Sequence, residues 1–533
     1  MTIIENTKIE NNSKLDYNVC IIGSGMSGQI ISSELINSKV LIVESGSLNF
    51  DEKIQSLNEI TSVGMDFRKD HKNRIRQLGG SANLWANQLM MLNESDLEKR
   101  EWIDTNNFFP INYRELENYY NKVISKIYKK NFRNIDIFKR YNKKYYNNFF
   151  EEEFTKDDVF DFNNHFWPSK VEKFDIRSNF TMKLFNSKNV DLIQKFTVTD
   201  LEFKDDNESI DFIKIKSGKK EVIVKADLYI LACGAIENAR LLLNNQNKSK
   251  ILKNENIGRY FMDHPRINLG SITSKKKLPL NHLFGFKYSD YSIRQSISLT
   301  KNHMAEKNLL NSYAFINPQF DKNNEILFSE FLTFLKILIK QKKFTKLNFK
   351  NLNIKSIAEQ IYLTIPPQIS NNYLNNFLRM IFEKNKYNFS FNKMNIDYQG
   401  EQFPNYNSSI YLNDKTDCYN QKKSVINWQL SNMDYKTLDE FIKIFHDKFR
   451  NHEYLSFDEN KNIEITDASH HIGTTRMSLN RSDGVIDHNC KFHDIKNLYI
   501  AGSSIYRISG SANPGFTNMA MSIRLGEHIN NIL

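Results

Sequence analysis

Residues 17–45 constrain the fold of this chain most, because they read as a strand, a glycine turn, a helix and a second strand that ends in an acid. The first apolar run, 19–22, leads into the turn GSGMSG at 23–28, and the second run, 40–43, ends at Glu44. In a βαβ unit of this kind the first glycine allows the tight turn, the second lets the backbone approach a pyrophosphate, and the third lets the helix pack close to the strand. The three glycines are Gly23, Gly25 and Gly28. The unit therefore predicts a bound dinucleotide.

Glu44 indicates which dinucleotide is bound. It follows Gly23 by 21 residues, which is about where a carboxylate can hold the ribose hydroxyls of an adenosine. The helix after the turn would offer free N–H groups and the positive end of its dipole to the phosphates. A carboxylate at this place disfavours a 2′-phosphate, so the sequence favours FAD or NAD over NADP.

The composition limits the other classes of function. With 533 residues the chain is long enough for two or more domains. Its 73 basic and 62 acidic residues leave a net charge of +11, a mild excess that is typical of a solvated surface rather than a nucleic-acid site. The four cysteines form no CxxC pair, and no His, Cys or Asp spacing indicates a metal site.

The N-terminal sequence bears on where the protein works. Residues 1–15 are polar, lack an apolar signal core and are expected to form a loose tail. The chain contains no run of 18 apolar residues, so no membrane span is expected. These features favour a cytoplasmic protein.

Three further segments predict local structure. Residues 78–85, LGGSANLW, pair two glycines with Ser and Asn, which suits close approach to a ligand, although an ordinary loop has the same composition. Residues 112–129 have helical spacing, with Asn112 as the N-cap and Glu115 three residues on. Residues 226–243 read as a buried strand, a small-residue turn and an amphipathic helix, which predicts a second βα crossover in the same sheet.

The region 271–463 has a different pattern. Short β-like pieces alternate there with apolar helical spacing at 326–339 and 375–383, and lysines cluster between these two stretches. One interpretation is a pair of core-facing helices with solvated lysines. The other is that 326–383 forms a lid, or a surface that contacts a membrane or an acidic partner.

The C-terminal block, 463–533, is again dense in glycine and histidine. It contains HHIGTTRM at 470–477, a strand at 498–501 followed by Gly502, the segment SGSANPGFT at 509–517, and a helix over 518–529. Together with the segments above, it makes the chain resemble the glucose–methanol–choline (GMC) oxidoreductases, flavoproteins that oxidise alcohols, sugars and sterols. The matching segments, in the family's order, are 17–45, 78–85, CGAIENARLLL at 233–243, GRYFMDHP at 258–265, EQFPNYNSSIYL at 401–412, 470–477, GVID at 484–487, NLYIAGSS at 497–504 and 509–517.

The resemblance implies an α/β fold, α+β overall, in which a Rossmann-like FAD-binding domain is interleaved with a substrate domain of a β-sheet flanked by helices. The FAD-binding domain would comprise 15–95, 175–270 and 464–533, and the substrate-binding domain 96–174 and 271–463. The cofactor contacts implied by the resemblance, beyond Gly23, Gly25, Gly28 and Glu44, are Gly79, Gly80, Ser81, Asn83, Val198, Cys233, Gly234, Gly502, Ser503, Asn513, Pro514 and Thr517.

The family pairs a catalytic His with a second His or an Asn. His470, three residues before Gly473, takes the position of the catalytic His, and Asn513 takes the partner position. Such a His can accept the proton of an alcohol while a hydride passes to flavin N5. His471 is expected to pack or to donate to the backbone, and His264 to be a structural hydrogen-bonding residue.

Leu84 departs from the members of the family that carry a His at or near this position, covalently bonded to the flavin. Noncovalent FAD is therefore expected. The expected partners are a small alcohol or sugar and an electron acceptor that the sequence does not identify. Two alternatives stay open at this point: an NAD-dependent dehydrogenase with two domains, and a flavin-binding scaffold without chemistry.

Overall fold

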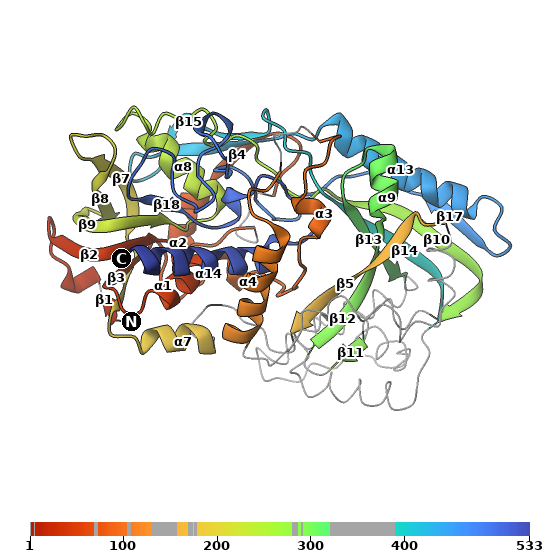
Figure 1. Cartoon of the computed structure of the whole chain (residues 1–533), viewed down its shortest axis with the longest axis horizontal. Coiled ribbons are helices and arrows are strands. Elements are labelled where there is room, and N and C mark those ends of the chain that lie inside the picture. Colours follow the sequence, from red (N-terminus) through yellow and green to blue (C-terminus); the bar gives the residue numbers. More distant parts are fainter. Residues whose placement is uncertain are drawn as a thin grey trace, which may run out of the picture.

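The computed structural model describes residues 2–4, 6–68, 73–103, 108–128, 157–168, 174, 178–279, 286–288, 291–319 and 390–533. The helices predicted within 326–383 lie outside these residues. Two large sheets dominate the described part, one at each end of the molecule (Figure 1).

The first sheet has eight strands and a parallel core. In order they are β1 (Thr2–Ile4), β6 (Val190–Gln194), β3 (Val40–Glu44), β2 (Lys14–Ile22), β9 (Lys220–Leu231), β8 (Ile210–Ser217) and β7 (Thr197–Phe203), with β18 (Leu498–Ile500) beside β9. The strands from β1 to β9, and β18, pair in parallel, whereas β7, β8 and β9 form an antiparallel extension. Helix α1 (Met26–Glu34) follows β2 directly, so the predicted strand–turn–helix–strand unit is present. The mixed α/β fold class is confirmed.

The N-terminal tail is a correction to the sequence analysis. Residues 1–15 were expected to be loose, but β1 pairs in parallel with β6, and β2 already begins at Lys14. Thr2, Ile3 and Ile4 are β-branched and suit a strand, and the edge of β6 offers unpaired backbone groups. Both isoleucines pack against the core of the first sheet.

The second sheet has seven strands and is antiparallel throughout. Its order is β11 (Phe286–Tyr288), β12 (Tyr291–Leu299), β13 (Ser312–Pro318), β14 (Ser390–Gly400), β10 (Arg266–Pro279) and β17 (Leu455–Glu459), with β5 (Phe160–Pro168) beside β12. Helix α13 (Asn432–Phe449) covers this sheet, and its Phe441 and Phe445 pack against Phe160 with tilted rings. The pattern of a sheet flanked by helices is the one expected for the region after residue 271.

A smaller third sheet joins distant segments. Strand β16 (Lys422–Trp428) pairs in parallel with β4 (Ile60–Gly64) and antiparallel with β15 (Ser409–Thr416). This sheet contacts α8 (Ala235–Asn245), the helix that follows β9. Strands β15 and β16 therefore lie against the first sheet's helix, although the domain boundaries drawn from the sequence assign both strands to the substrate domain.

Local signals set the helix boundaries. The Asn112 side chain accepts the Glu115 N–H at 2.8 Å and caps α4 (Tyr113–Lys126), as predicted. Helix α14 (Pro514–Ile532) begins four residues before the expected start, because Pro514 occupies the first turn, where the missing N–H has no helical partner to lose. Helices α1, α4 and α14 pack together on one side of the first sheet (Figure 1). The other short elements are α2 (Glu52–Gln55), α3 (Glu94–Leu97), α7 (Asn179–Phe185), α9 (Lys301–Lys307), η1 (Asn6–Lys8), η2 (Ser56–Asn58), η3 (Gly80–Asn83), η6 (Arg481–Asp483) and η7 (Ser503–Ile505).

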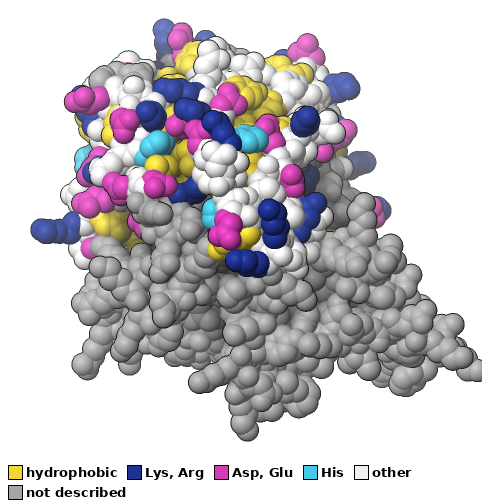
Figure 2. Space-filling model, turned by 90° about the vertical axis from the view of Figure 1, so that its right-hand side faces the viewer, with side chains coloured by type: hydrophobic (Ala, Val, Ile, Leu, Met, Phe, Trp, Pro, Cys, Tyr) yellow, Lys and Arg dark blue, Asp and Glu magenta, His cyan; other side chains and the backbone are white. Residues whose placement is uncertain are grey.

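Charges of both signs mix on the surface. On the described part of the face in Figure 2, basic and acidic side chains lie interspersed. Within the part of the chain that the structure describes, none of the helices has the length and apolar character needed to cross a membrane.

Candidate active site

A cavity of about 500 Å³ gathers segments that are far apart in the sequence. It lies at the carboxyl ends of β2, β3 and β9, where open α/β sheets bind their ligands. The start of α1, the turn before α8, the loop before Gly473 and the start of α14 complete its wall.

Most of the predicted site residues line this cavity. Those that do are His470, Gly23, Gly25, Glu44, Gly80, Ser81, Val198, Cys233, Gly234, Gly502, Ser503, Asn513 and Pro514. Four predicted residues lie behind the wall: Gly28, Gly79, Asn83 and Thr517. Thr517 bonds the Tyr120 hydroxyl at 2.6 Å and Asn83 donates to the Leu78 carbonyl at 2.8 Å, so both hold wall segments in place.

The glycines of the wall leave room for a ligand against the backbone. A Cβ at Gly234 or Gly502 would meet no atom within 4 Å, and one at Gly25 would find only the Gly79 carbonyl, at 3.9 Å. Gly23 differs, because a Cβ there would lie 2.6 Å from the Ala232 carbonyl. Gly23, Gly234 and Gly502 have φ values of +106°, +82° and +98°, which L side chains rarely adopt, so the backbone requires glycine at all three positions. Gly25, Gly234 and Gly502 also expose bare backbone to the cavity. A dinucleotide fits this cradle.

Glu44 ties the glycine turn to the end of β3. Its Oε2 accepts the N–H of Ser24 at 3.0 Å and the Ser24 hydroxyl at 2.7 Å, and its Oε1 accepts the Gly46 N–H at 2.7 Å. Oε1 also accepts the Ser45 hydroxyl, at the long distance of 3.4 Å, and this weakest of the four bonds is the one that a ribose hydroxyl could replace. Glu44 lines the cavity, as a ribose-binding residue would have to.

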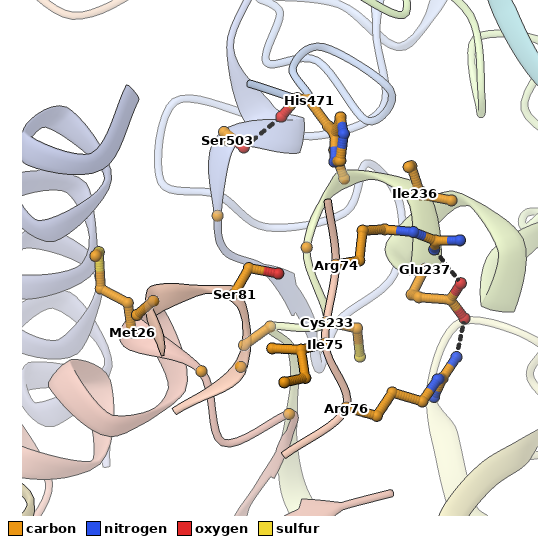
Figure 3. Close-up of a pocket in the computed structure, with 18 of the residues that line it drawn as sticks. Met26, Arg74, Ile75, Arg76, Ser81, Cys233, Ile236, Glu237, His471 and Ser503 are labelled. Atoms are coloured by element: carbon orange, nitrogen blue, oxygen red, sulfur yellow. Dashed lines mark hydrogen bonds and ion pairs between the residues drawn. The ribbon is translucent and has the colours of Figure 1, made fainter. Parts of the chain in front are cut away.

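A buried ion cluster forms another wall. Figure 3 shows Arg74 and Arg76 on either side of Glu237, with ion-pair distances of 2.8 and 2.5 Å. Arg240 lies 3.5 Å from Glu237 and 2.7 Å from Asp417. Burial would raise the pKa of Glu237, but the three guanidinium groups outweigh it and lower that pKa to about 2. The positive charges of Arg74, Arg76 and Arg240 are therefore balanced mainly by Glu237 and Asp417 within the wall.

His470 lines the cavity, and its ring is hydrogen-bonded to that of His264, which lies behind the wall. His264 Nε2 lies 2.9 Å from the Gly510 carbonyl, so this nitrogen must carry a proton and donate it. His264 Nδ1 is then an acceptor, and it lies 2.9 Å from His470 Nδ1, which must be the donor. Burial lowers the pKa of both imidazoles, to about 4 for His264, so both are neutral at neutral pH. The chain of bonds leaves the lone pair of His470 on Nε2.

The loop that carries His470 is held by a buried carboxylate. Asp263 accepts the backbone N–H groups of His264 at 2.7 Å, Ala468 at 3.0 Å and His470 at 3.0 Å. The ligand atoms of Asp263, His264 and His470 lie within 4.8 Å of one another, but the bonds above already engage them. The sequence predicted only a structural role for His264 and did not indicate its contact with His470. Its position in the matched segment 258–265 was the available signal.

Asn513 is held by Gln399 from the second sheet and by Gln88. Its Oδ1 accepts from Gln399 Nε2 at 3.0 Å, and Gln399 Oε1 accepts from Arg266 Nε at 2.8 Å. Its Nδ2 donates to Gln88 Oε1 at 2.7 Å, and Gln88 in turn contacts the buried His165. Arginine can only donate, so it fixes the orientation of every amide in this series. One Nδ2 hydrogen of Asn513 remains for a ligand.

His471 is placed differently from His470. Its ring packs 5.3 Å from that of Phe67, and burial lowers its pKa to about 3. Its carbonyl accepts the Ser503 hydroxyl at 2.5 Å (Figure 3). Its Nε2 has no hydrogen-bond partner among the described residues, and the residue lines the cavity. His471 is thus a second neutral imidazole at the wall, without the bonds that orient His470.

The fold and the cavity define a dinucleotide-binding α/β protein with an oriented histidine at the cofactor cavity. Family models for the GMC oxidoreductases match residues 73–266 and 404–522, which together exceed half of the chain. The chain therefore belongs to the GMC oxidoreductase family. It is an oxidoreductase, and its family supports FAD as the cofactor.

Solved structures agree on the fold. A formate oxidase variant from Aspergillus oryzae RIB40 is 14% identical, with 98% of this chain and 99% of that chain covered and a TM-score of 0.55. The pyridoxine 4-oxidase from Mesorbium loti is 12% identical, with coverage of 96% and 98% and a TM-score of 0.53. None of the curated protein sequences matches this chain.

Proposed function

We propose that this protein oxidises the CH–OH group of a sugar, polyol or other alcohol, with noncovalently bound FAD as the hydride acceptor and His470 as the general base. The observation that carries the proposal is the orientation of the histidine pair. A base needs an unprotonated nitrogen that faces the substrate, and the bonds from Gly510 through His264 leave that nitrogen at His470 Nε2.

The electrostatics of the cavity keep His470 ready to accept a proton. Burial lowers its pKa most, and the nearby positive charge of Arg266 acts in the same direction. The imidazole is therefore neutral at neutral pH, and the hydroxyl proton of a bound alcohol can move to Nε2. General-base help of this kind is worth about 100- to 10,000-fold in rate.

Asn513 is proposed to position the alcohol. Its Oδ1 and one Nδ2 hydrogen are bonded to Gln399 and Gln88, so the remaining N–H has a fixed direction. That N–H can donate to the substrate oxygen while His470 takes the proton. Both residues line the same cavity, although 43 positions separate them in the sequence.

FAD would occupy the glycine cradle, and when bound it supplies the electron sink at its N5 atom. The exposed backbone of Gly25 suits the pyrophosphate, and Glu44 suits the ribose hydroxyls. Leu84, which lines the cavity, has no nucleophile for a covalent link to the flavin, so we propose noncovalent binding.

The test is an anaerobic screen of the purified protein. The absorption spectrum should show the two bands of oxidised flavin, and an alcohol substrate should bleach them. Neutral sugars, polyols and primary alcohols are mixed with the protein one at a time, without oxygen. A protein that lacks flavin and reduces NAD with an alcohol would be an NAD-dependent dehydrogenase instead. Flavin that no alcohol bleaches would favour the scaffold without chemistry.

A further inference from the structure

Arg266 places a cation in the cavity that no acid of the described residues neutralises. Arg74, Arg76 and Arg240 of the wall pair with Glu237 or Asp417, whereas neither Arg266 nor the other exposed arginine of the cavity, Arg68, has an ion pair among the described residues. Its only side-chain hydrogen bond among these residues runs from Nε to Gln399 Oε1, at 2.8 Å. Its side chain is exposed and lines the cavity.

The backbone fixes Arg266 with respect to the base. Arg266 begins β10, two residues after His264. Its N–H donates to the Thr466 carbonyl at 2.9 Å, and the Thr466 N–H donates back at 3.0 Å, four residues before His470. Backbone hydrogen bonds therefore connect the segment that carries His264 and Arg266 to the segment that carries His470. The charge of Arg266 reaches the base, since it contributes to the lowered pKa of His470.

The bond from Nε decides which edge of the guanidinium is available. Gln399 holds Nε and so limits rotation of the planar group. The two terminal nitrogens remain, with N–H donors that run parallel and match the two oxygens of a carboxylate. A neutral alcohol offers one oxygen to this pair of donors, whereas a carboxylate offers two oxygens and a charge opposite to that of the guanidinium.

We propose that Arg266 binds a carboxylate of the substrate, and that the substrate class is alcohols that also carry a carboxylate, such as hydroxy acids and sugar acids. This inference rests on the proposed oxidation at His470. The carboxylate would lie against the terminal nitrogens of Arg266 and direct the hydroxyl-bearing carbon to His470 Nε2.

The experiment compares 4-(hydroxymethyl)benzoate with 4-(hydroxymethyl)benzamide, which have the same reacting group and nearly the same shape. Their dissociation constants for the oxidised holoprotein are measured by the change in the flavin spectrum and by titration calorimetry. The native protein should bind the acid at least about tenfold more tightly than the amide, because hydrogen bonds to charged groups contribute more than neutral ones. Arg266→Met should abolish this preference, and Arg266→Lys should keep part of it.

Arg68→Met is the matched control. Arg68 also lines the cavity as an exposed cation without an ion pair among the described residues, but none of their side chains anchors it. Its replacement removes the same charge and should change the preference less than about threefold, because an unanchored exposed cation acts only through screened electrostatics. Equal binding of acid and amide by the native protein would overturn the inference, as would a preference that survives in Arg266→Met or disappears equally in Arg68→Met.

Anaerobic flavin reduction by the same pair separates this inference from the proposed oxidation. If the acid binds through Arg266 and never bleaches the flavin, the oxidation fails and the carboxylate site stands. If acid and amide bleach the flavin equally in the native protein and in Arg266→Met, the oxidation stands and the inference fails. Arg266→Met also removes the donor that orients Gln399, and this change would slow flavin reduction by the acid and by the amide alike. A decrease in rate that is confined to the acid therefore identifies the contact with the carboxylate.

Discussion

Replacing His264 by leucine should slow flavin reduction although the base itself is untouched. In the native protein His264 Nδ1 accepts the Nδ1–H of His470 at 2.9 Å, and the Gly510 carbonyl fixes His264 as that acceptor. Leucine removes the acceptor and leaves the Nδ1–H of His470 without a partner. His470 can then also adopt the tautomer with its proton on Nε2. In that tautomer Nε2 has no lone pair and cannot accept the proton of the substrate.

The size of the effect follows from the bond that is lost. A neutral hydrogen bond contributes about 0.5–1.5 kcal/mol, and a buried donor left unpaired costs about 1–3 kcal/mol. About 1.4 kcal/mol corresponds to a tenfold change in rate. His264→Leu should therefore lower the rate constant of flavin reduction about five- to tenfold. His264→Asn should retain most of the rate, because its Oδ1 can take the place of the imidazole Nδ1 as acceptor.

The assay is anaerobic stopped-flow reduction with one alcohol, at pH values on the plateau of the native profile. Flavin content and the far-ultraviolet spectrum are recorded to exclude unfolding. His264→Leu should lower the limiting rate, and His264→Asn should restore it to within about threefold. Equal limiting rates for His264→Leu and the native protein, with flavin retained, would refute the argument. A loss as large for asparagine as for leucine would show that ring packing, not the acceptor, matters.

Three further predictions concern the cofactor and the wall. Acid precipitation should release the flavin into the supernatant, since Leu84 offers no covalent link, and colour that stays in the pellet would contradict this. Glu44→Ala should weaken FAD binding in a fluorescence titration and lower the melting temperature of the holoprotein, because a ligand that binds only the native state stabilises it; an unchanged dissociation constant would remove the assignment. Glu237→Gln should lower the free energy of unfolding at pH 7 by about 3 kcal/mol with FAD in excess, because three guanidinium groups lose their counter-charge. Since the pKa of Glu237 is lowered from its ordinary value to about 2 in the folded protein, this contribution is complete above about pH 4.5 and should disappear as the pH falls towards 2; Glu98→Gln, in an exposed pair with Lys301, is the control and should change stability little.

The sequence predicted the parts of the fold that depend on local chemistry. The unit over 17–45 and the crossover over 226–243 carry their own glycine turns and apolar runs, and both appear in one parallel sheet. The cap at Asn112 depends on a side chain and a backbone group three residues apart. In each case the interacting groups are near neighbours, so the pattern could be recognised without the rest of the chain.

The parts that were missed depend on distant partners. Strand β1 forms because β6, nearly 190 residues later, offers an edge, and β4 pairs with β16 across about 360 residues. Asn513 was predicted as a site residue, but Gln399 and Gln88, which orient it, follow no motif of their own. Their role exists only because the second sheet meets the start of α14. His264 lay in a recognised segment, yet its bond to His470 spans 206 positions.

The central claim is that His470 Nε2 is the base, and flavin reduction in His470→Ala tests it most directly. The variant should keep FAD, because the side chain faces the cavity, and its rate of reduction should fall about 100- to 10,000-fold. In the native protein the rate should rise with pH and reach its plateau before neutral pH, because burial lowers the pKa of His470 well below its ordinary value. His471→Ala should do less, since none of the bonds that orient His470 passes through its side chain. If His471→Ala abolishes flavin reduction and His470→Ala leaves it intact, the wrong histidine has been assigned.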